Sequence, residues 1–149
     1  MQKNTLNHFQ RVSLWKKWIA GTPVPQGSMR TFMVQGRPVI THSNPNLKKW
    51  RKVLAASFQE FAPSVPGDLY YGVALTFVLH RPKYHSTMGD EAPKAPHVKP
   101  DLDKLIRAVL DALTDAKVIS DDAHICSIEA KKCYGEEEGV EVCFEELQY

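Results

Sequence analysis

The sequence has few cysteines and no long apolar run, and both shortages exclude classes of protein. Its three cysteines are odd in number, and no two of them have the Cys-x-x-Cys spacing of zinc sites and redox motifs. We therefore expect reduced thiols and no disulfide framework, as in a cytoplasmic protein. No apolar stretch approaches the ~20 residues that span a bilayer, and the first residues lack the apolar core of a signal peptide. The sequence thus predicts a protein without a membrane partner.

Acidic residues are scarce in the first two-thirds of the chain. Residues 1–100 carry 14 Lys and Arg against 4 Asp and Glu, whereas residues 101–149 carry 5 against 13. The net charge of +2 hides this division. A basic surface suits a polyanion such as DNA, and a local group of carboxylates suits a divalent cation. The same distribution also fits a solvated surface whose charges happen to segregate.

The length and periodicity of the chain predict one domain, residues 1–149. A chain of 149 residues that is 43% hydrophobic can bury a substantial core. The expected order of elements is α/β (α+β), with a small mixed β-sheet covered by two main helices. Residues 1–12 are expected to form a flexible arm, and residues 81–98 a mobile loop. The periodicity predicts strands at 13–20, 69–80, 124–134 and 140–144, a hairpin of 31–34 with 37–41, and helices at 47–61 and from 101 onward.

Two pairs of aspartates flank the second helix. Pro100 disfavours a helical conformation at Lys99, so the helix is expected to begin at or just after Asp101. Its apolar residues recur every three or four positions, which gives it one buried face. The turn after the helix carries Asp121-Asp122. This turn could bring the second pair back to Asp101 and Asp103, and carboxylates gathered at one place are ligands for Mg²⁺ or Mn²⁺.

Each of these acids also has an ordinary structural interpretation. Asp101 can be a helix N-cap, Asp103 a favourable charge in the first helical turn, and the Asp121-Asp122 pair part of a turn. On spacing alone, this structural interpretation is the more economical one.

Two sequence blocks favour the metal site. The first contains Lys99-Pro100-Asp101-Leu102-Asp103, a helix ending in Leu-Asp-Ala-Leu at 110–113, then Ser120-Asp121-Asp122 and a strand ending at 131–135. The second is the Gly-x-Pro-x-Pro-rich stretch at 21–30. In this order, the blocks resemble the RusA family of Holliday-junction resolvases, especially its phage and prophage members. The resemblance spans roughly residues 17–146.

The resemblance implies a homodimeric, Mg²⁺-dependent endonuclease that makes paired nicks in four-way DNA junctions during recombination and repair. Matched position by position, it implies catalytic metal ligands at Asp101, Asp103 and Asp122, with Asp121 as a supporting acid and Mn²⁺ able to replace Mg²⁺. Arg107 stands where the family often has a functional Lys and keeps the positive charge, although Arg does not simply replace Lys. Lys104 stands where the family usually has Asn, a departure that concerns the surroundings of the ligands more than the ligands themselves.

Basic residues supply the expected DNA contacts. The proline-rich loop leads into Arg30, and the first turns of the helix at 47–61 carry four cations. The loop at 81–98 carries further cations that could guide a junction. Lys132 is the second candidate, after Arg107, for neutralising the charge that develops on the phosphate. The expected DNA-binding residues are Arg30, Lys48, Lys49, Arg51, Lys52, Lys99 and Lys132.

Two other functions fit the same residues. A non-catalytic branched-DNA-binding protein would bind junctions whether or not Mg²⁺ is present and would give no nicked product. A metal-dependent phosphohydrolase acting on simple nucleotide substrates would prefer neither branched DNA nor dimeric binding, and the basic first two-thirds of the chain argues against it. We expect a nuclease in the cytoplasm of a bacterial or phage-infected cell.

Overall fold

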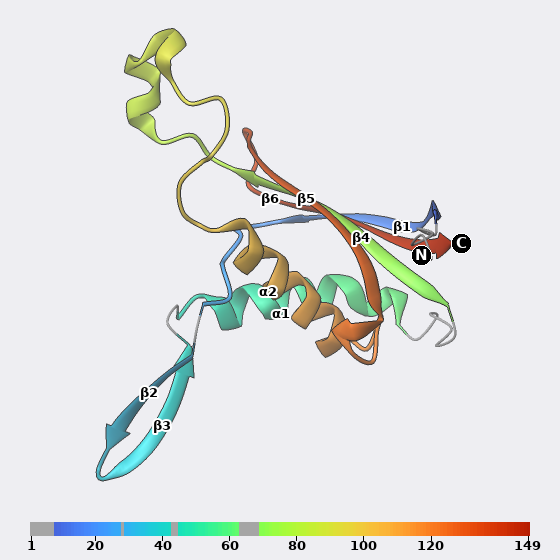
Figure 1. Ribbon diagram of the computed structural model, residues 1–149. Helices are drawn as coiled ribbons and strands as arrows, with labels where there is room; N and C mark the ends of the chain where they lie inside the picture. The colour runs from blue at the N-terminus through green and yellow to red at the C-terminus, as the bar shows by residue number, and fades with distance from the viewer. Residues whose placement is uncertain (1–7, 28, 43–44, 63–68) are drawn as a thin grey trace, which may run out of the picture.

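The computed structural model describes residues 8–27, 29–42, 45–62 and 69–149, without the side chains at 29–32 and 39–42. It contains a four-stranded sheet, a separate two-stranded hairpin and two main helices (Figure 1). This confirms the predicted α+β class with a small mixed sheet. The strands of the sheet, in spatial order, are β1 (Gln10–Ala20), β6 (Gly139–Gln148), β4 (Tyr70–Leu79) and β5 (Ile125–Tyr134).

Strand β4 lies inside the sheet, as its apolar character predicts. Beyond the exposed Tyr70 at its start, its residues alternate between a buried face, which includes Val73 and Phe77, and a second face of small or half-buried residues. It pairs antiparallel with β6 and parallel with β5, so the sheet is mixed. A parallel pair needs a long crossover connection, and here residues 80–124 supply it. The second acidic pair therefore precedes β5, at the opposite end of this crossover from β4.

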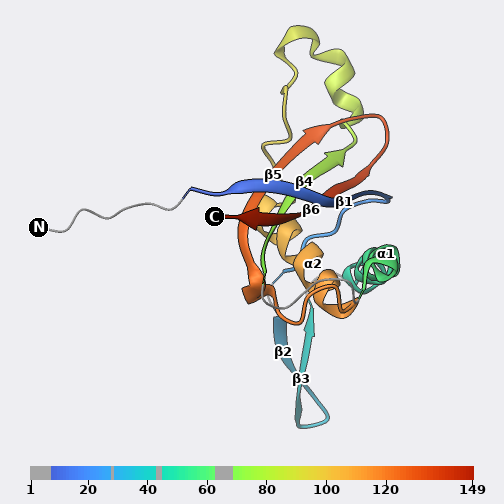
Figure 2. The ribbon, with the colours of Figure 1, turned by 90° about the vertical axis from the view of Figure 1, so that its right-hand side faces the viewer.

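Two helices, α1 (Leu47–Phe58) and α2 (Leu102–Asp115), cover one face of the sheet (Figures 1 and 2). Leu54 and Phe58 of α1 and Leu105 and Leu113 of α2 are fully buried and belong to one core with the inner face of β4. An ion pair also joins the helices. The Nε and Nη2 atoms of Arg51 donate to one carboxylate oxygen of Asp115, at 3.2 and 2.8 Å.

Trp15 anchors the edge strand β1 to this core. Its ring stacks on Phe61, in the short helix η1 (Gln59–Phe61) that follows α1, with 4.0 Å between ring centroids, and on Phe144 of β6, at 5.3 Å. Such aromatic pairs contribute about 0.5–1.5 kcal/mol each beyond the area they bury. Trp15 is thus a packing residue.

The N-terminal boundary of the sheet differs from the prediction. Strand β1 begins at Gln10, so residues 10–12 of the expected flexible arm belong to the sheet, and residues 1–7 lie outside the described residues. Arg11 explains the extension. Its guanidinium reaches across the outer face of the sheet to Glu145 of β6, at 3.1 Å, and to Ser127 of β5. Gly72 on the intervening β4 is paired with both partners and has no side chain to block this path.

Two segments project from the body of the molecule. The hairpin of β2 (Met29–Val34) and β3 (Arg37–His42) turns at Gln35-Gly36, where both residues have positive φ, 50° and 74°. This is the tight hairpin predicted from Gln-Gly between two apolar strands. The second projection is residues 81–98, here called the crossover lobe (Figures 1 and 2).

The crossover lobe, predicted as a long loop, contains two short helices, η2 (Lys83–Thr87) and η3 (Gly89–Glu91). It leaves β4 at one end of the sheet and leads directly into α2. In both views the start of α2 lies between the lobe and the hairpin. None of the helices in the described ranges is long and apolar enough to cross a bilayer.

Candidate metal and DNA site

Lys132 of β5 fixes the backbone that leads into the first acidic pair. Its ammonium donates to the carbonyl oxygens of Val98, at 2.7 Å, and Pro100, at 2.8 Å. Two of its three N–H donors are thereby used to position the residues just before Asp101. This positioning role was not foreseen from the sequence, where Lys132 is predicted to bind DNA. A phosphate contact through its third donor stays a prediction.

The carboxylate of Asp101 is not used as a helix cap. Asp101 has the extended backbone of an N-cap residue, φ −70° and ψ 137°, yet its side chain makes no capping hydrogen bond. Its Oδ2 atom instead lies 3.5 Å from the ammonium of Lys104, and about half of the side chain is exposed. The predicted N-cap position of Asp101 is therefore confirmed for its backbone, whereas its carboxylate does not cap the helix and has one oxygen near the ammonium of Lys104.

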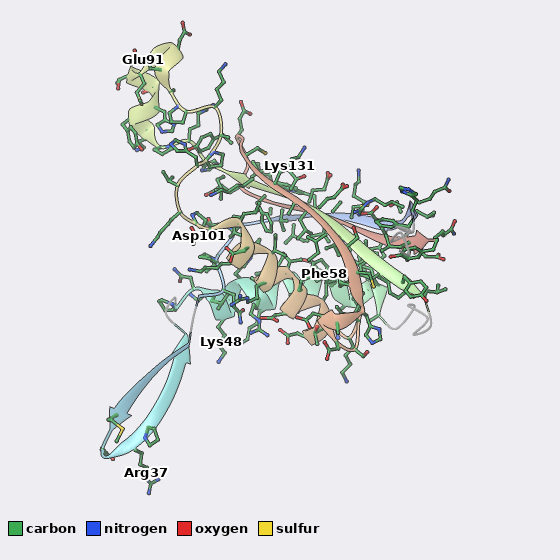
Figure 3. The ribbon with its side chains drawn as sticks, viewed as in Figure 1. Arg37, Lys48, Phe58, Glu91, Asp101 and Lys131 are labelled. Atoms are coloured by element: carbon green, nitrogen blue, oxygen red, sulfur yellow. The ribbon has the colours of Figure 1, made fainter. Side chains whose placement is uncertain are left out.

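Asp103 lies in the first turn of α2 and is exposed to solvent. It has no hydrogen bond or ion pair with another described residue. Its position near the positive end of the helix dipole favours its negative charge. Asp101 and Asp103 thus present two accessible carboxylates at the start of α2. Figure 3 shows Asp101 at this position, where the chain enters α2 from the crossover lobe.

The second acidic pair forms the turn before β5. Asp121 caps the short helix η4 (Asp122–His124), because its carboxylate accepts a hydrogen bond from the backbone N–H of Ala123 at 2.9 Å. This bond, and then a hydrogen bond with Asp122, lowers the pKa of Asp121. The same shared hydrogen bond raises the pKa of Asp122, with smaller contributions from desolvation and from the negative charges of Asp121 and Asp111. The predicted turn role of Asp121 is thus confirmed.

The two acidic pairs lie at opposite ends of α2. Asp122 is close enough to Asp111, in the third turn of α2, to feel its charge. Asp111 follows Asp103 by eight residues, which is about 12 Å along a helix axis. In the described part of the chain, no three His, Cys, Asp or Glu side chains lie close enough together to hold a metal ion. The expected meeting of Asp101, Asp103 and Asp122 around one ion is therefore not found within a single chain.

The reason for this separation is the topology of the crossover. Strands β4 and β5 are parallel, so α2 must carry the chain back from the carboxyl end of β4 to the amino end of β5. Asp101 stands at the start of this return path and Asp122 at its end. The turn before β5 thus follows the whole length of α2, which lies between the two pairs and packs in the core.

Arg107 and Asp111 lie between the two pairs on one side of α2. They follow Asp103 at intervals of four residues, and positions four apart are neighbours on a helix surface. Arg107 is exposed and forms no ion pair with any described acid, so its charge is available. Asp111 is not among the predicted site residues, and its negative charge is close enough to Asp122 to raise the pKa of that carboxyl.

The predicted DNA-binding cations have different structural settings. Lys48, Lys49 and Lys52 are exposed on α1, and Lys99 is exposed just before α2. Arg51 forms an ion pair with Asp115 that links α1 to α2, so it has a structural role in addition to the predicted DNA contact. The side chain of Arg30 lies outside the described part of the chain. DNA contact by these residues stays a prediction.

Replacing Asp122 by Asn should leave the melting temperature at neutral pH unchanged or slightly raised. The raised pKa of Asp122 means that its ionisation costs folding stability as the pH rises through that pKa. The neutral amide avoids this cost and can still donate to Asp121. Any advantage of the variant should therefore shrink as the pH is lowered, because Asp122 then becomes neutral in the original protein.

Calorimetry of both proteins between pH 3 and 7 would measure this difference. Asp111→Asn is the matched control, and it should act in the same direction with a smaller effect, because Asp111 contributes less to the shift. A clear loss of stability in Asp122→Asn throughout this range would show that the Asp122 carboxylate is a structural ligand of the turn.

Comparison with known proteins identifies the family. A family model described as endodeoxyribonuclease RusA matches residues 20–145, a range that includes both acidic pairs, Arg107 and the crossover lobe. A search of curated proteins found no match. Since the family model covers most of the 149 residues, the chain belongs to the RusA endodeoxyribonuclease family.

Proposed function

We propose that this protein is a Mg²⁺-dependent, structure-selective endonuclease that resolves Holliday junctions by paired symmetric nicks. The observation that carries the proposal is the RusA family match over residues 20–145, since the family is one of endodeoxyribonucleases. The carboxylates at the start of α2 support it, because they are exposed and are not used to cap the helix. A metal-dependent nuclease needs such acids to hold its metal ion. The basic first two-thirds of the chain supports a polyanionic substrate.

The donor set at the start of α2 fits Mg²⁺. This ion commonly takes one or two protein carboxylates and completes its octahedron with waters and substrate phosphate oxygens. Asp101 and Asp103 offer two accessible carboxylates of this kind. When bound there, Mg²⁺ would polarise the scissile phosphate and lower the pKa of a water molecule. Mn²⁺ has similar ligand preferences and is expected to replace it.

The residues around this pair have separate tasks in the proposed reaction. Lys132 holds the backbone before Asp101, and so keeps the carboxylates in place as DNA arrives. Arg107 would neutralise the negative charge that grows on the phosphate oxygens during attack. Lys104 lies where an incoming cation would bind to Asp101 and must give up its contact for that cation.

The proposed substrate also implies a dimer. A four-way junction has two-fold symmetry, and paired nicks in opposing strands need two sites related by the same symmetry. We therefore propose a homodimer in which each protomer contributes the carboxylates at the start of its α2. Asp122 is proposed as the third acid of the reaction, supplied either by the same protomer as Asp101 or by its partner, and a mixing experiment distinguishes these two arrangements.

Incubation of the purified protein with a labelled four-way junction tests the proposal. With Mg²⁺, two nicks at symmetric positions should appear, and chelation of the metal should prevent them without releasing the junction. A linear duplex of the same sequence is the control and should remain intact. Junction binding without product at any metal concentration would favour a non-catalytic binding protein. Preferential hydrolysis of mononucleotides would favour a simple phosphohydrolase.

A further inference from the structure

The crossover lobe contains a pocket that the family assignment does not explain. Its volume is about 940 Å³, which is large enough for a nucleotide unit. Arg81, Lys83 and Lys94 line it, with Asp90 as the one acid. It lies at the carboxyl ends of the two parallel strands, because Arg81 follows β4 and packs over Tyr134, the last residue of β5.

The cations of this pocket differ from the cations on the body of the protein that are neutralised by a nearby acid. Lys16, Lys17 and Arg51 each have a carboxylate oxygen within 4 Å. By contrast, Arg81, Lys83 and Lys94 form no ion pair with any acid in the described ranges. Cations form strong hydrogen bonds with anionic groups. Because no described acid neutralises these three, they can bind an anion from outside the chain.

Arg81 is held ready for such an anion. Its Nη1 atom donates to the carbonyl oxygen of Pro93 at 2.6 Å, and its guanidinium lies 4.6 Å from the centre of the Tyr134 ring. These contacts fix the plane of the guanidinium and use one of its five N–H donors. The remaining donors have no partner among the described residues. A fixed guanidinium loses little freedom when it binds a phosphate.

His85 provides an independent sign of a ligand. It lines the pocket, is only 6% exposed, and packs edge-on against Tyr84 and Tyr134. Its Nδ1 atom is buried and has no hydrogen-bond partner among the described residues. Buried polar atoms are nearly always paired, so an unpaired one that lines a pocket calls for a partner from outside the chain, such as a ligand or a bound water. The lobe thus buries a polar ring that its own residues do not satisfy.

We propose that the crossover lobe binds a phosphate of the DNA backbone in this pocket, away from the scissile phosphate. Three unpaired cations suit a phosphodiester, and the pocket is wide enough to admit the sugar beside it. The lobe ends at Val98, whose carbonyl is bound by Lys132 together with that of Pro100. DNA held by the lobe is thereby placed in a fixed relation to Asp101. This assignment rests on the proposed function in one respect, namely that the bound polyanion is DNA.

Binding measured without cleavage tests the pocket. A labelled four-way junction is titrated with protein in chelator at 50 to 200 mM salt, and Kd is followed by anisotropy. The variant Lys83→Gln/Lys94→Gln should bind about tenfold more weakly at 0.1 M salt for each phosphate that it no longer binds. The slope of log Kd against log salt should fall by about one for each such phosphate. The matched control is Lys16→Gln/Lys131→Gln, which removes two exposed charges from β1 and β5.

Equal affinity and equal salt slope in the lobe variant and the control would overturn the assignment. His85→Phe keeps the buried ring and removes the unpaired nitrogen. It should weaken junction binding while the melting temperature stays equal or rises, and a merely structural histidine would not give this combination. Unchanged binding by His85→Phe would contradict a role for His85 in the pocket.

Two further measurements separate related explanations. Inorganic phosphate or AMP at millimolar concentration, compared with KCl at equal ionic strength, should compete with the junction, and Lys83→Gln/Lys94→Gln should abolish this competition. Free phosphate that binds in the pocket without any effect on junction affinity would identify a separate anion site and overturn the backbone assignment. If the original protein binds through the lobe but cuts no junction, the nuclease proposal fails and the lobe assignment stands.

Discussion

Asp101→Asn and Asp103→Asn should each reduce junction cleavage at least about a thousandfold and leave junction binding equal or tighter. A carboxylate that holds Mg²⁺ contributes several kcal/mol of charge stabilisation in the transition state, and about 4 kcal/mol corresponds to a factor of 10³. Asn has nearly the same shape but no charge, so the metal is lost. Removing a negative charge beside a phosphate favours DNA binding. Single-turnover cleavage and anisotropy on the same junction would measure the two effects.

Lys104→Asn is the matched control, because it changes the neighbour of Asp101 without changing a proposed ligand. It removes the ammonium that lies 3.5 Å from the Asp101 carboxylate. Less competition for this carboxylate should lower the Mg²⁺ concentration required for half-maximal cleavage. If Asp101→Asn and Asp103→Asn both cut at the original rate, the start of α2 is not the metal site.

Asp122→Asn decides how the third acid takes part. If it also abolishes cleavage, Asp101 and Asp122 take part in the same reaction, although about 10 Å or more of α2 separates them within one chain. Mixing inactive Asp101→Asn with inactive Asp122→Asn then distinguishes two arrangements. Restored single nicks would show that a site takes Asp101 from one protomer and Asp122 from its partner. No restoration would place both acids in the same protomer, brought together when DNA binds.

Local chemistry explains why much of the fold is predictable. The hairpin follows from Gln35-Gly36, where the turn needs two residues with positive φ. The inner position of β4 follows from its apolar residues on both faces. The start of α2 follows from Pro100, which forces the preceding residue out of the helical region. These elements are encoded by neighbours in the sequence, so no knowledge of the tertiary structure is needed.

The arrangement of the candidate site is less predictable because it depends on strand pairing. Nothing in the sequence states that β4 and β5 are parallel, and this pairing is what sends Asp122 to the far end of α2. The roles of Lys132 and Arg51 depend in the same way on partners 32 and 64 residues distant along the chain. Residue types identified the candidate acids and cations, but only the packing shows which of them already have partners.

Arg107→Ala should lower the single-turnover rate of cleavage about 10²- to 10³-fold with little change in junction affinity. A cation placed beside the phosphate acts mainly when negative charge grows on its oxygens, so its removal affects the transition state more than the bound substrate. Arg107→Lys keeps the charge and should recover most of this loss, although it lacks the planar fork of donors. Arg107 is exposed and has no ion pair with a described acid, so neither variant should disturb folding. An Arg107→Ala protein that cuts at the original rate would exclude this role and leave Lys132 as the candidate, whereas a parallel loss of affinity would assign Arg107 to ground-state DNA binding.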